Sequence, residues 1–139
     1  SDLAHGAGLD TANGIIVNEL LQTSHPDIYA AGDNALFPYQ ALGKHMRVEH
    51  WDNALAQGAC AGRNMAGAHT EYSYMPYFFS DLFDFGYEAL GDTNPAYDIE
   101  TDWQEENKTG TVYYIQKGRL RGVLLCNVWN KIDEAREWI

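Results

Sequence analysis

The chain has 139 residues, 45% of them hydrophobic, and a formal net charge of −11. This is enough for one globular domain, or for a small domain with part of another. The acidic balance argues against nucleic acid or an anionic membrane as a partner, because phosphate groups would be repelled. No apolar run reaches the roughly 18 residues that a membrane span needs, and no signal peptide opens the chain, so we expect a cytoplasmic protein. The opening residues include no methionine and precede any full element, so we expect a piece of a longer protein.

The first part of the chain is expected to contain short strands and one long helix. Residues 14–18 are rich in β-formers and follow a turn pair. The apolar run at residues 28–32 predicts a buried strand that delivers Asp33 at its carboxyl end. Residues 34–48 show no clear periodicity, and we expect a loop there.

Residues 49–65 predict a helix with Glu49, His50 and Trp51 in its first turn. One face is expected to pack closely against a neighbour, because apolar and small residues recur on it at helical spacing: Trp51, Leu55, Gly58 or Ala59, Gly62 and Met65. A helix amino terminus offers unpaired N–H groups and a positive dipole end, which suit an electron-rich group. With Asp33 beside it, this start is a candidate site for a polar, partly anionic cofactor.

The residues by themselves leave other interpretations open. Asp33 can accept hydrogen bonds from vicinal hydroxyls of a sugar or ribityl chain, or it can act as a cap or turn residue. Glu49 can simply satisfy the helix dipole, and Trp51 can belong to the core. A metal site fits no standard ligand spacing, because neighbouring side chains diverge on a helix; its ligands would be His45, Glu49, His50 and Asp52.

The second part of the chain is dense in aromatic residues, so we place a domain boundary between residues 69 and 70. Its fold is predicted to be a small antiparallel sheet with a helix beside it, which makes the fold class α+β. Strands are expected at residues 86–91, 97–103, 111–116 and 120–128, the last two joined by a tight hairpin at residues 117–119. Residues 130–139 predict a closing helix with Asn130 as a cap.

Three side chains of this second part are candidates for contact with a cofactor. Phe78 and Phe79 can cover one face of an aromatic ring by stacking, or they can belong to the core. Glu88 can meet cofactor hydroxyls, or it can be a solvated strand residue. The two cysteines, Cys60 and Cys126, form no CxxC pair and signal neither a zinc site nor a redox disulfide.

Several of these stretches resemble a known family. AGLDTANGIIVNELLQTSHPDIYAAGD, at residues 7–33, resembles the last segment of the flavin domain in pyridine nucleotide–disulphide oxidoreductases. The blocks with VEHW, SDL and GYE, at residues 47–67 and 77–92, together with residues 110–137, resemble apoptosis-inducing factor-like proteins and the ferredoxin and rubredoxin reductases. The resemblance implies that residues 1–69 are the end of an α/β FAD-binding domain. Residues 70–139 would then be the C-terminal, dimerisation-like α+β domain.

The resemblance also implies cofactors and contacts. In the full-length protein these are FAD and NAD(P)H. Asp33 would bind the ribityl and pyrophosphate side of FAD, while the helix start would lie at the isoalloxazine ring and the second part would face the nicotinamide. The implied cofactor-binding residues are Asp33, Glu49, His50, Trp51, Phe79 and Glu88.

The implied activity is hydride transfer from NAD(P)H to FAD, followed by electron transfer to a ferredoxin-like or rubredoxin-like protein, a quinone or oxygen. Both glycine-rich dinucleotide fingerprints of the family are absent from these 139 residues, so we expect the isolated chain to be inactive. The second hypothesis is a homodimerisation or partner-docking module without catalysis of its own. A third is a structural domain without a ligand.

Overall fold

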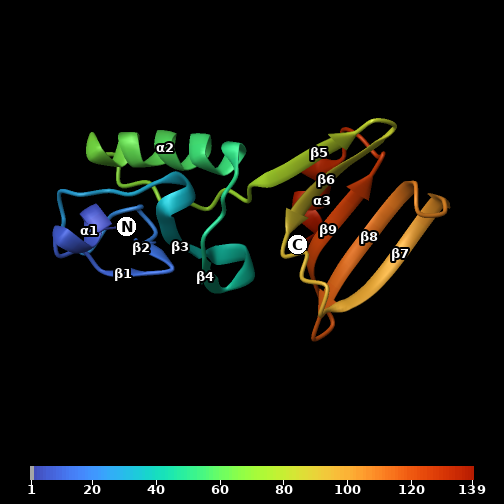
Figure 1. Ribbon diagram of the computed structural model, residues 1–139, viewed down its shortest axis with the longest axis horizontal. Coiled ribbons are helices and arrows are strands. Elements are labelled where there is room, and N and C mark those ends of the chain that lie inside the picture. The colour runs from blue at the N-terminus through green and yellow to red at the C-terminus, as the bar shows by residue number, and fades with distance from the viewer. Residues whose placement is uncertain (1) are drawn as a thin grey trace. The chain divides into compact units, whose positions relative to one another are not determined.

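The computed structural model describes residues 2–139, which divide into two compact units (Figure 1). The first unit extends to Tyr74, and the second is Met75–Ile139. Residues beyond 69 stay with the first unit because the Tyr72 N–H donates to the Glu19 carbonyl at 2.7 Å, and the Thr70 N–H donates to Asn64 Oδ1, also at 2.7 Å. The assignment of residues 1–69 and 70–139 to two family domains stays a prediction.

The first unit is built on a small mixed sheet with strand order β1-β2-β3-β4. β2 and β3 are parallel, and the other two pairs are antiparallel. The strands are β1 (Thr11–Ala12), β2 (Gly14–Ile16), β3 (Ala35–Tyr39) and β4 (Lys44–Met46). The helices are α1 (Asp2–Gly6) and α2 (Trp51–Met65), with 3-10 turns η1 (Gly32–Asn34) and η2 (Gln40–Leu42). This unit therefore mixes α and β elements, as the sequence predicts.

Aromatic side chains from distant segments meet in the core of the first unit. Phe37 on β3 is buried, and its ring lies 5.4 Å from the Tyr72 ring in an edge-on arrangement. The Tyr72 hydroxyl is also buried and donates to Asn53 Oδ1 on α2 at 3.1 Å. The core thus joins the sheet, the helix and the segment after the helix.

The prediction of a loop at residues 34–48 is wrong, because this stretch contains β3 and β4. Burial alternates along β3, with Ala35, Phe37 and Tyr39 facing the core. Pro38 obscures that alternation in the sequence. It is tolerated because β3 pairs with β2 only at its first two residues and beyond them has β4 as its one neighbour, so a missing N–H costs little.

The prediction of a buried strand at residues 28–32 is also wrong. This segment makes only one isolated bridge, between Gln22 and Tyr29, and Ile28 is exposed. Its pairing is limited to hydrogen bonds with residues 21–23 across the turn at Pro26, which is too short for a ladder. The strand that enters the sheet is β3, so Asp33 precedes a strand instead of ending one.

The helix at residues 49–65 exists, but it begins at Trp51 and its buried face is not the predicted one. The predicted face is exposed, at 71% for Trp51, 53% for Leu55 and 67% for Met65. The buried face is polar and consists of Asn53, Gln57, Cys60, Ala61 and Asn64. Loops satisfy the two asparagine amides of this face: Asn53 Nδ2 donates to the Val48 carbonyl and Asn64 Nδ2 to the Leu20 carbonyl. A hydrophobic pattern cannot identify a face that is buried through hydrogen bonds.

The second unit is a five-stranded antiparallel sheet in the order β5-β6-β9-β8-β7, with one helix, α3 (Ile132–Trp138) (Figure 1). The strands are β5 (Tyr77–Leu82), β6 (Phe85–Gly91), β7 (Asp98–Glu105), β8 (Thr109–Gln116) and β9 (Arg119–Cys126). The four predicted strands are confirmed within a few residues, as are the hairpin at Lys117 and Gly118 and the α+β class. β5 was not predicted.

The closing helix is confirmed, but Asn130 is not its cap. The helix begins at Ile132, the cap position is Lys131, whose side chain does not cap the helix, and Asn130 has φ +61°. Ala135 on this helix is fully buried, and Arg136 Nε donates to the Met75 carbonyl at 3.1 Å. The hydrogen bond from α3 to Met75 thus joins the end of the second unit to its first residue.

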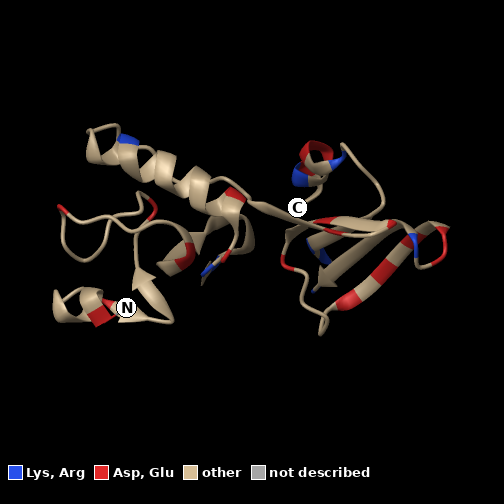
Figure 2. Cartoon of the chain, turned by 45° about the horizontal axis from the view of Figure 1, so that its top comes forward, with Lys and Arg blue, Asp and Glu red and all other residues tan. Residues whose placement is uncertain are grey.

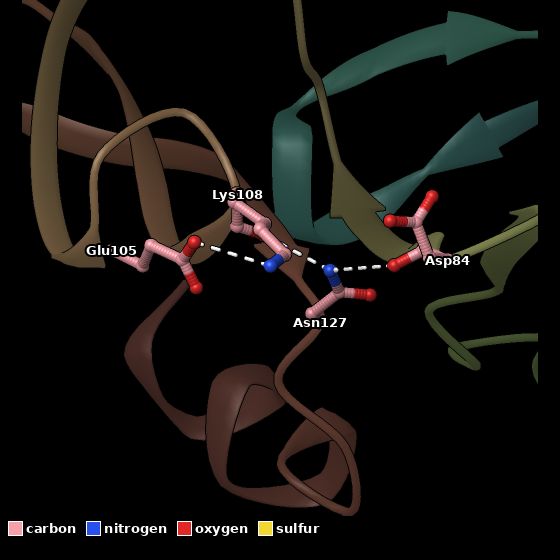
Figure 3. Close-up of polar contacts among 4 residues, drawn as sticks. All are labelled: Asp84, Glu105, Lys108 and Asn127. Atoms are coloured by element: carbon pink, nitrogen blue, oxygen red, sulfur yellow. Dashed lines mark hydrogen bonds and ion pairs between the residues drawn. The ribbon is translucent and has the colours of Figure 1, made fainter.

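Asn127 ties the loops at one end of this sheet together (Figure 3). Its Oδ1 accepts the Gly86 N–H at 2.8 Å, and its Nδ2 donates to the carbonyls of Asp84 at 3.3 Å and Lys108 at 3.1 Å. One side chain thus links the β5–β6 turn, the β7–β8 turn and the end of β9.

Candidate functional site

The turn that carries Asp33 packs against α2. Gly32 begins this turn with φ +77°, a conformation that favours glycine, and its N–H donates to Gln57 Oε1 on α2 at 2.8 Å. A Cβ at Gly32 would lie 3.4 Å from the Ala54 Cβ, so the small residue on the helix allows the close approach. The Asp33 carboxylate is exposed.

Arg47 links Asp33 to the segment that leads into the helix. Its Nη1 donates to the Asp33 carbonyl at 2.8 Å, and its Nη2 lies 2.5 Å from Glu49 Oε1. The structure therefore brings Asp33 and Glu49 onto the same arginine. Arg47 contacts the backbone of Asp33 and the side chain of Glu49, and it was not predicted as a site residue. The common cofactor site of Asp33 and the helix start stays a prediction.

Glu49 and His50 precede α2 instead of forming its first turn. His50 is the N-cap, and its Nδ1 accepts the Asp52 N–H at 3.4 Å. Trp51 is the first helical residue, and its exposure excludes the alternative that its ring lies in the core of this unit. The indole is thus available at the helix start, where N–H groups and the dipole favour negative charge.

Two buried donor atoms beside this turn have no hydrogen-bond partner among residues 2–139. They are Arg47 Nε and Gln57 Nε2. Buried donors are normally paired, so these two groups have lost their hydration without gaining a hydrogen bond within the described residues. The group at this turn that a cofactor can reach is the exposed Asp33, whose carboxylate fits the hydroxyl groups of FAD because it accepts hydrogen bonds.

In the second unit, Phe79 and Glu88 are register partners on β5 and β6, which places them on one face of the sheet. Phe79 is about half exposed, and its ring lies 6.3 Å from the Tyr77 ring. Phe78 pairs with Ala89 and therefore belongs to the opposite face. The prediction that Phe78 and Phe79 cover the same ring face is wrong, because consecutive residues of a strand point to opposite sides.

Glu88 has an unusual environment for a carboxylate. Its Oε2 is buried without a hydrogen-bond partner in the part of the chain that the structure describes. Burial raises the pKa of Glu88 above its usual value, and the nearby Asp81 charge raises it further. A protonated or proton-sharing carboxyl at this position could donate to, as well as accept from, a ligand hydroxyl.

Arg47 and Gln57 are the site residues that sequence reasoning missed. Arg47 stands in the stretch predicted as a loop, and Gln57 stands on a helix face that the hydrophobic pattern assigns to solvent. Their proximity to Asp33 depends on the packing of η1 on α2, which no local sequence pattern predicts.

Among the described residues there is no group of three or more metal-ligating side chains, and no helix is long and apolar enough to cross a membrane.

Comparisons with known proteins give a consistent result. Residues 1–58 match the pyridine nucleotide-disulphide oxidoreductase family. The chain is 38% identical over 144 residues to the mitochondrial apoptosis-inducing factor 1 of Dictyostelium discoideum, covering 94% of this chain and 27% of that protein. A ferredoxin reductase from Rhodopseudomonas palustris has 34% identity and a TM-score of 0.81, covering 91% of this chain and 31% of its own.

A further solved structure, putidaredoxin reductase in covalent complex with putidaredoxin, has 32% identity and a TM-score of 0.83 over 98% of this chain and 32% of that chain. The chain therefore spans about a third or less of the length of the relatives that it matches. Residues 1–58 therefore belong to the pyridine nucleotide-disulphide oxidoreductase family, and the chain over nearly its whole length is similar to an apoptosis-inducing factor and to ferredoxin reductases.

Proposed function

We propose that the full-length protein is an FAD-dependent NAD(P)H oxidoreductase that passes electrons to a further acceptor. The observation that carries the proposal is the pair of contacts from Arg47 to the Asp33 carbonyl and the Glu49 carboxylate, at the amino-terminal end of α2. Bound FAD would supply the redox chemistry, and the protein would bind and orient it. The matched relatives, which include apoptosis-inducing factor and a ferredoxin reductase, support this reading.

The residues have distinct roles in this proposal. The exposed Asp33 carboxylate accepts hydrogen bonds from the ribityl hydroxyls of FAD. Glu49, His50 and Trp51 lie at the ring end, where the start of α2 stabilises negative charge. Phe79 covers a flat ring, and Glu88 meets a ribose hydroxyl of NAD(P)H.

The test is made in the full-length protein with Asp33→Ala, Glu49→Gln and an Asn130→Ala control in the second unit. We expect Asp33→Ala to raise the FAD dissociation constant by about tenfold or more, because it removes charge-assisted hydrogen bonds. We expect Glu49→Gln to change the kinetics of flavin reduction by NADH. Unchanged FAD binding and unchanged kinetics in both variants would favour a structural domain without a ligand.

The acceptor is proposed to be a ferredoxin-like or rubredoxin-like protein, with a quinone as the alternative. The neighbour solved in complex with putidaredoxin supports a protein acceptor of this kind. Acidic residues line β7 at Asp98, Glu100, Asp102 and Glu105 (Figure 2). An acidic acceptor would be repelled from β7, and so would nucleic acid, which we do not expect as a partner.

A second candidate function is a homodimerisation or partner-docking module. It is favoured by apolar side chains that the second unit exposes, including Phe83, Leu82 and Trp129. Light scattering of the purified chain distinguishes a monomer from a dimer. A dimer supports this function, and a monodisperse monomer opposes dimerisation. A cytoplasmic location remains part of the proposal, supported by the two free, buried thiols Cys60 and Cys126, which are typical of a reducing compartment.

A further inference from the structure

The peptide segment Gly32–Asp33 is held from both sides by side chains that come from elsewhere in the first unit. On one side, Gln57 Oε1 on α2 accepts the Gly32 N–H at 2.8 Å. On the other side, Arg47 Nη1 donates to the Asp33 carbonyl at 2.8 Å. Both bonds fix the backbone and leave the Asp33 carboxylate exposed.

Burying the Gln57 amide costs free energy, so a specific interaction of this side chain must offset that cost. Its side chain is 0% exposed, so the amide is buried in the packed face of α2. A buried amide loses its hydration, and Nε2 recovers no hydrogen bond from residues 2–139. An aliphatic residue would fill the same space without this penalty, but it would leave the Gly32 N–H without its acceptor.

The Arg47 side chain passes close to the backbone of Gly14, where a larger residue would clash with it. A Cβ at Gly14, which has φ +132°, would lie 2.9 Å from Arg47 Cδ and 2.9 Å from the Asn34 carbonyl oxygen. The guanidinium then spans from the Asp33 carbonyl to Glu49 Oε1, 2.5 Å away. Arg47 therefore couples the turn to the segment that leads into α2.

We propose that Gln57 and Arg47 are positioning residues that hold the Gly32–Asp33 backbone, so that the Asp33 carboxylate keeps one orientation toward the cofactor. The inference rests on the proposed function, in which Asp33 binds FAD. Two hydrogen bonds to the backbone restrict the conformations of this short turn. The Asp33 carboxylate that it carries therefore loses less conformational entropy when it binds ligand hydroxyls. Neither residue needs to touch the cofactor for this effect.

The test uses the full-length protein and two variants, each with a control matched in chemistry. Gln57→Leu removes the acceptor of the Gly32 N–H. Its control is Asn64→Leu, which removes a buried amide from the same face of α2 but one that binds the Leu20 and Thr70 carbonyls. Arg47→Met removes the bond to the Asp33 carbonyl together with the ion pair to Glu49, so Glu49→Gln is measured beside it as the variant that weakens the ion pair alone. A second control is Arg63→Met, which makes the same charge change on α2.

We expect Gln57→Leu and Arg47→Met each to raise the FAD dissociation constant by about 3- to 10-fold, the value of one hydrogen bond. The visible circular dichroism of the bound flavin should change as well, because the geometry of its binding site is altered. Asn64→Leu should lower the melting temperature but leave FAD affinity within about twofold, because the hydrogen bonds of Asn64 go to Leu20, Cys60 and Thr70 and do not reach the turn. Arg63→Met should change neither quantity.

The outcomes separate this inference from the proposed function. Asp33→Ala is measured beside these variants. If it leaves FAD affinity unchanged, the assignment of Asp33 to FAD fails. If Asp33→Ala weakens FAD binding while Gln57→Leu and Arg47→Met keep wild-type affinity and circular dichroism, the positioning role alone is overturned. An equal loss in Asn64→Leu also overturns it for Gln57, and if Gln57→Leu does not fold, Arg47→Met decides.

Discussion

Glu88 has one carboxylate oxygen that is buried and unpartnered within residues 2–139, on a strand face that it shares with Phe79. Burial is the first cause of its raised pKa, and the charge on Asp81 is the second. Such a group stays protonated to higher pH than an ordinary glutamate.

We predict that NMR titration of the ¹³C-labelled Glu88 carboxyl gives a pKa above the usual glutamate value. Asp81→Asn should lower this pKa only in part, because burial remains. The unfolded chain releases this proton at lower pH than the folded chain, so the folded state holds more protons between the two pKa values. Stability should therefore fall as pH rises through that interval, and Glu88→Gln should remove this contribution. A normal pKa for Glu88 would show that water reaches both oxygens.

At the scale of elements, α2 shows that a regular hydrophobic pattern can predict the wrong face of a helix to be buried. Its period was predicted correctly, but Trp51, Leu55 and Met65 face outward. The inward face is held by hydrogen bonds to backbone outside the helix, because Asn53 and Asn64 donate to carbonyls and Gln57 accepts the Gly32 N–H. A count of apolar residues does not register these bonds. Buried polar residues are stable only when tertiary structure supplies their partners.

We predict that Trp51→Ala changes the unfolding free energy of this chain by no more than about 0.5 kcal/mol, because the side chain is exposed. Phe37→Ala on β3, by contrast, should cost about 3–5 kcal/mol, because that ring is buried. Denaturant titrations of both variants give the comparison. A large loss in Trp51→Ala would mean that the indole packs within this unit.

Asn127 shows how one side chain can hold several elements together. We predict that Asn127→Ala destabilises the second unit by about 2–3 kcal/mol, because three backbone groups lose their partner. The control is Lys108→Ala, which removes only the exposed ion pair with Glu105 shown in Figure 3 and should cost about 0.5 kcal/mol or less. Urea unfolding followed by circular dichroism measures both. Similar values for the two variants would contradict the role of Asn127.

At the scale of the whole molecule, the predicted site residues lie in two compact units. Asp33 and the Glu49–Trp51 segment belong to the first, and Phe79 and Glu88 belong to the second. Neither unit contains a glycine-rich dinucleotide fingerprint, because none occurs in the 139 residues. We therefore expect that these residues alone do not form a complete cofactor site.

We predict that the purified 139-residue chain mixed with FAD shows no bound-flavin spectrum and does not oxidise NADH. The reason is that the pyrophosphate of FAD binds chiefly to a glycine-rich strand–turn–helix that this chain lacks. Absorbance of the protein fraction after desalting and a standard NADH assay check the two parts. Robust flavin binding would show that the Asp33 turn and α2 suffice.

The sequence by itself determined the α+β class, the hairpin-rich second half, the closing helix and the family, because these depend on local patterns and on motifs that stay together along the chain. The tertiary structure alone decided that Asp33 precedes a strand, that the polar face of α2 is the buried one, and that Arg47 and Gln57 flank the Asp33 turn. These features depend on contacts between segments 14 and 25 residues apart, and the partner of a buried polar group is not encoded in its own neighbourhood.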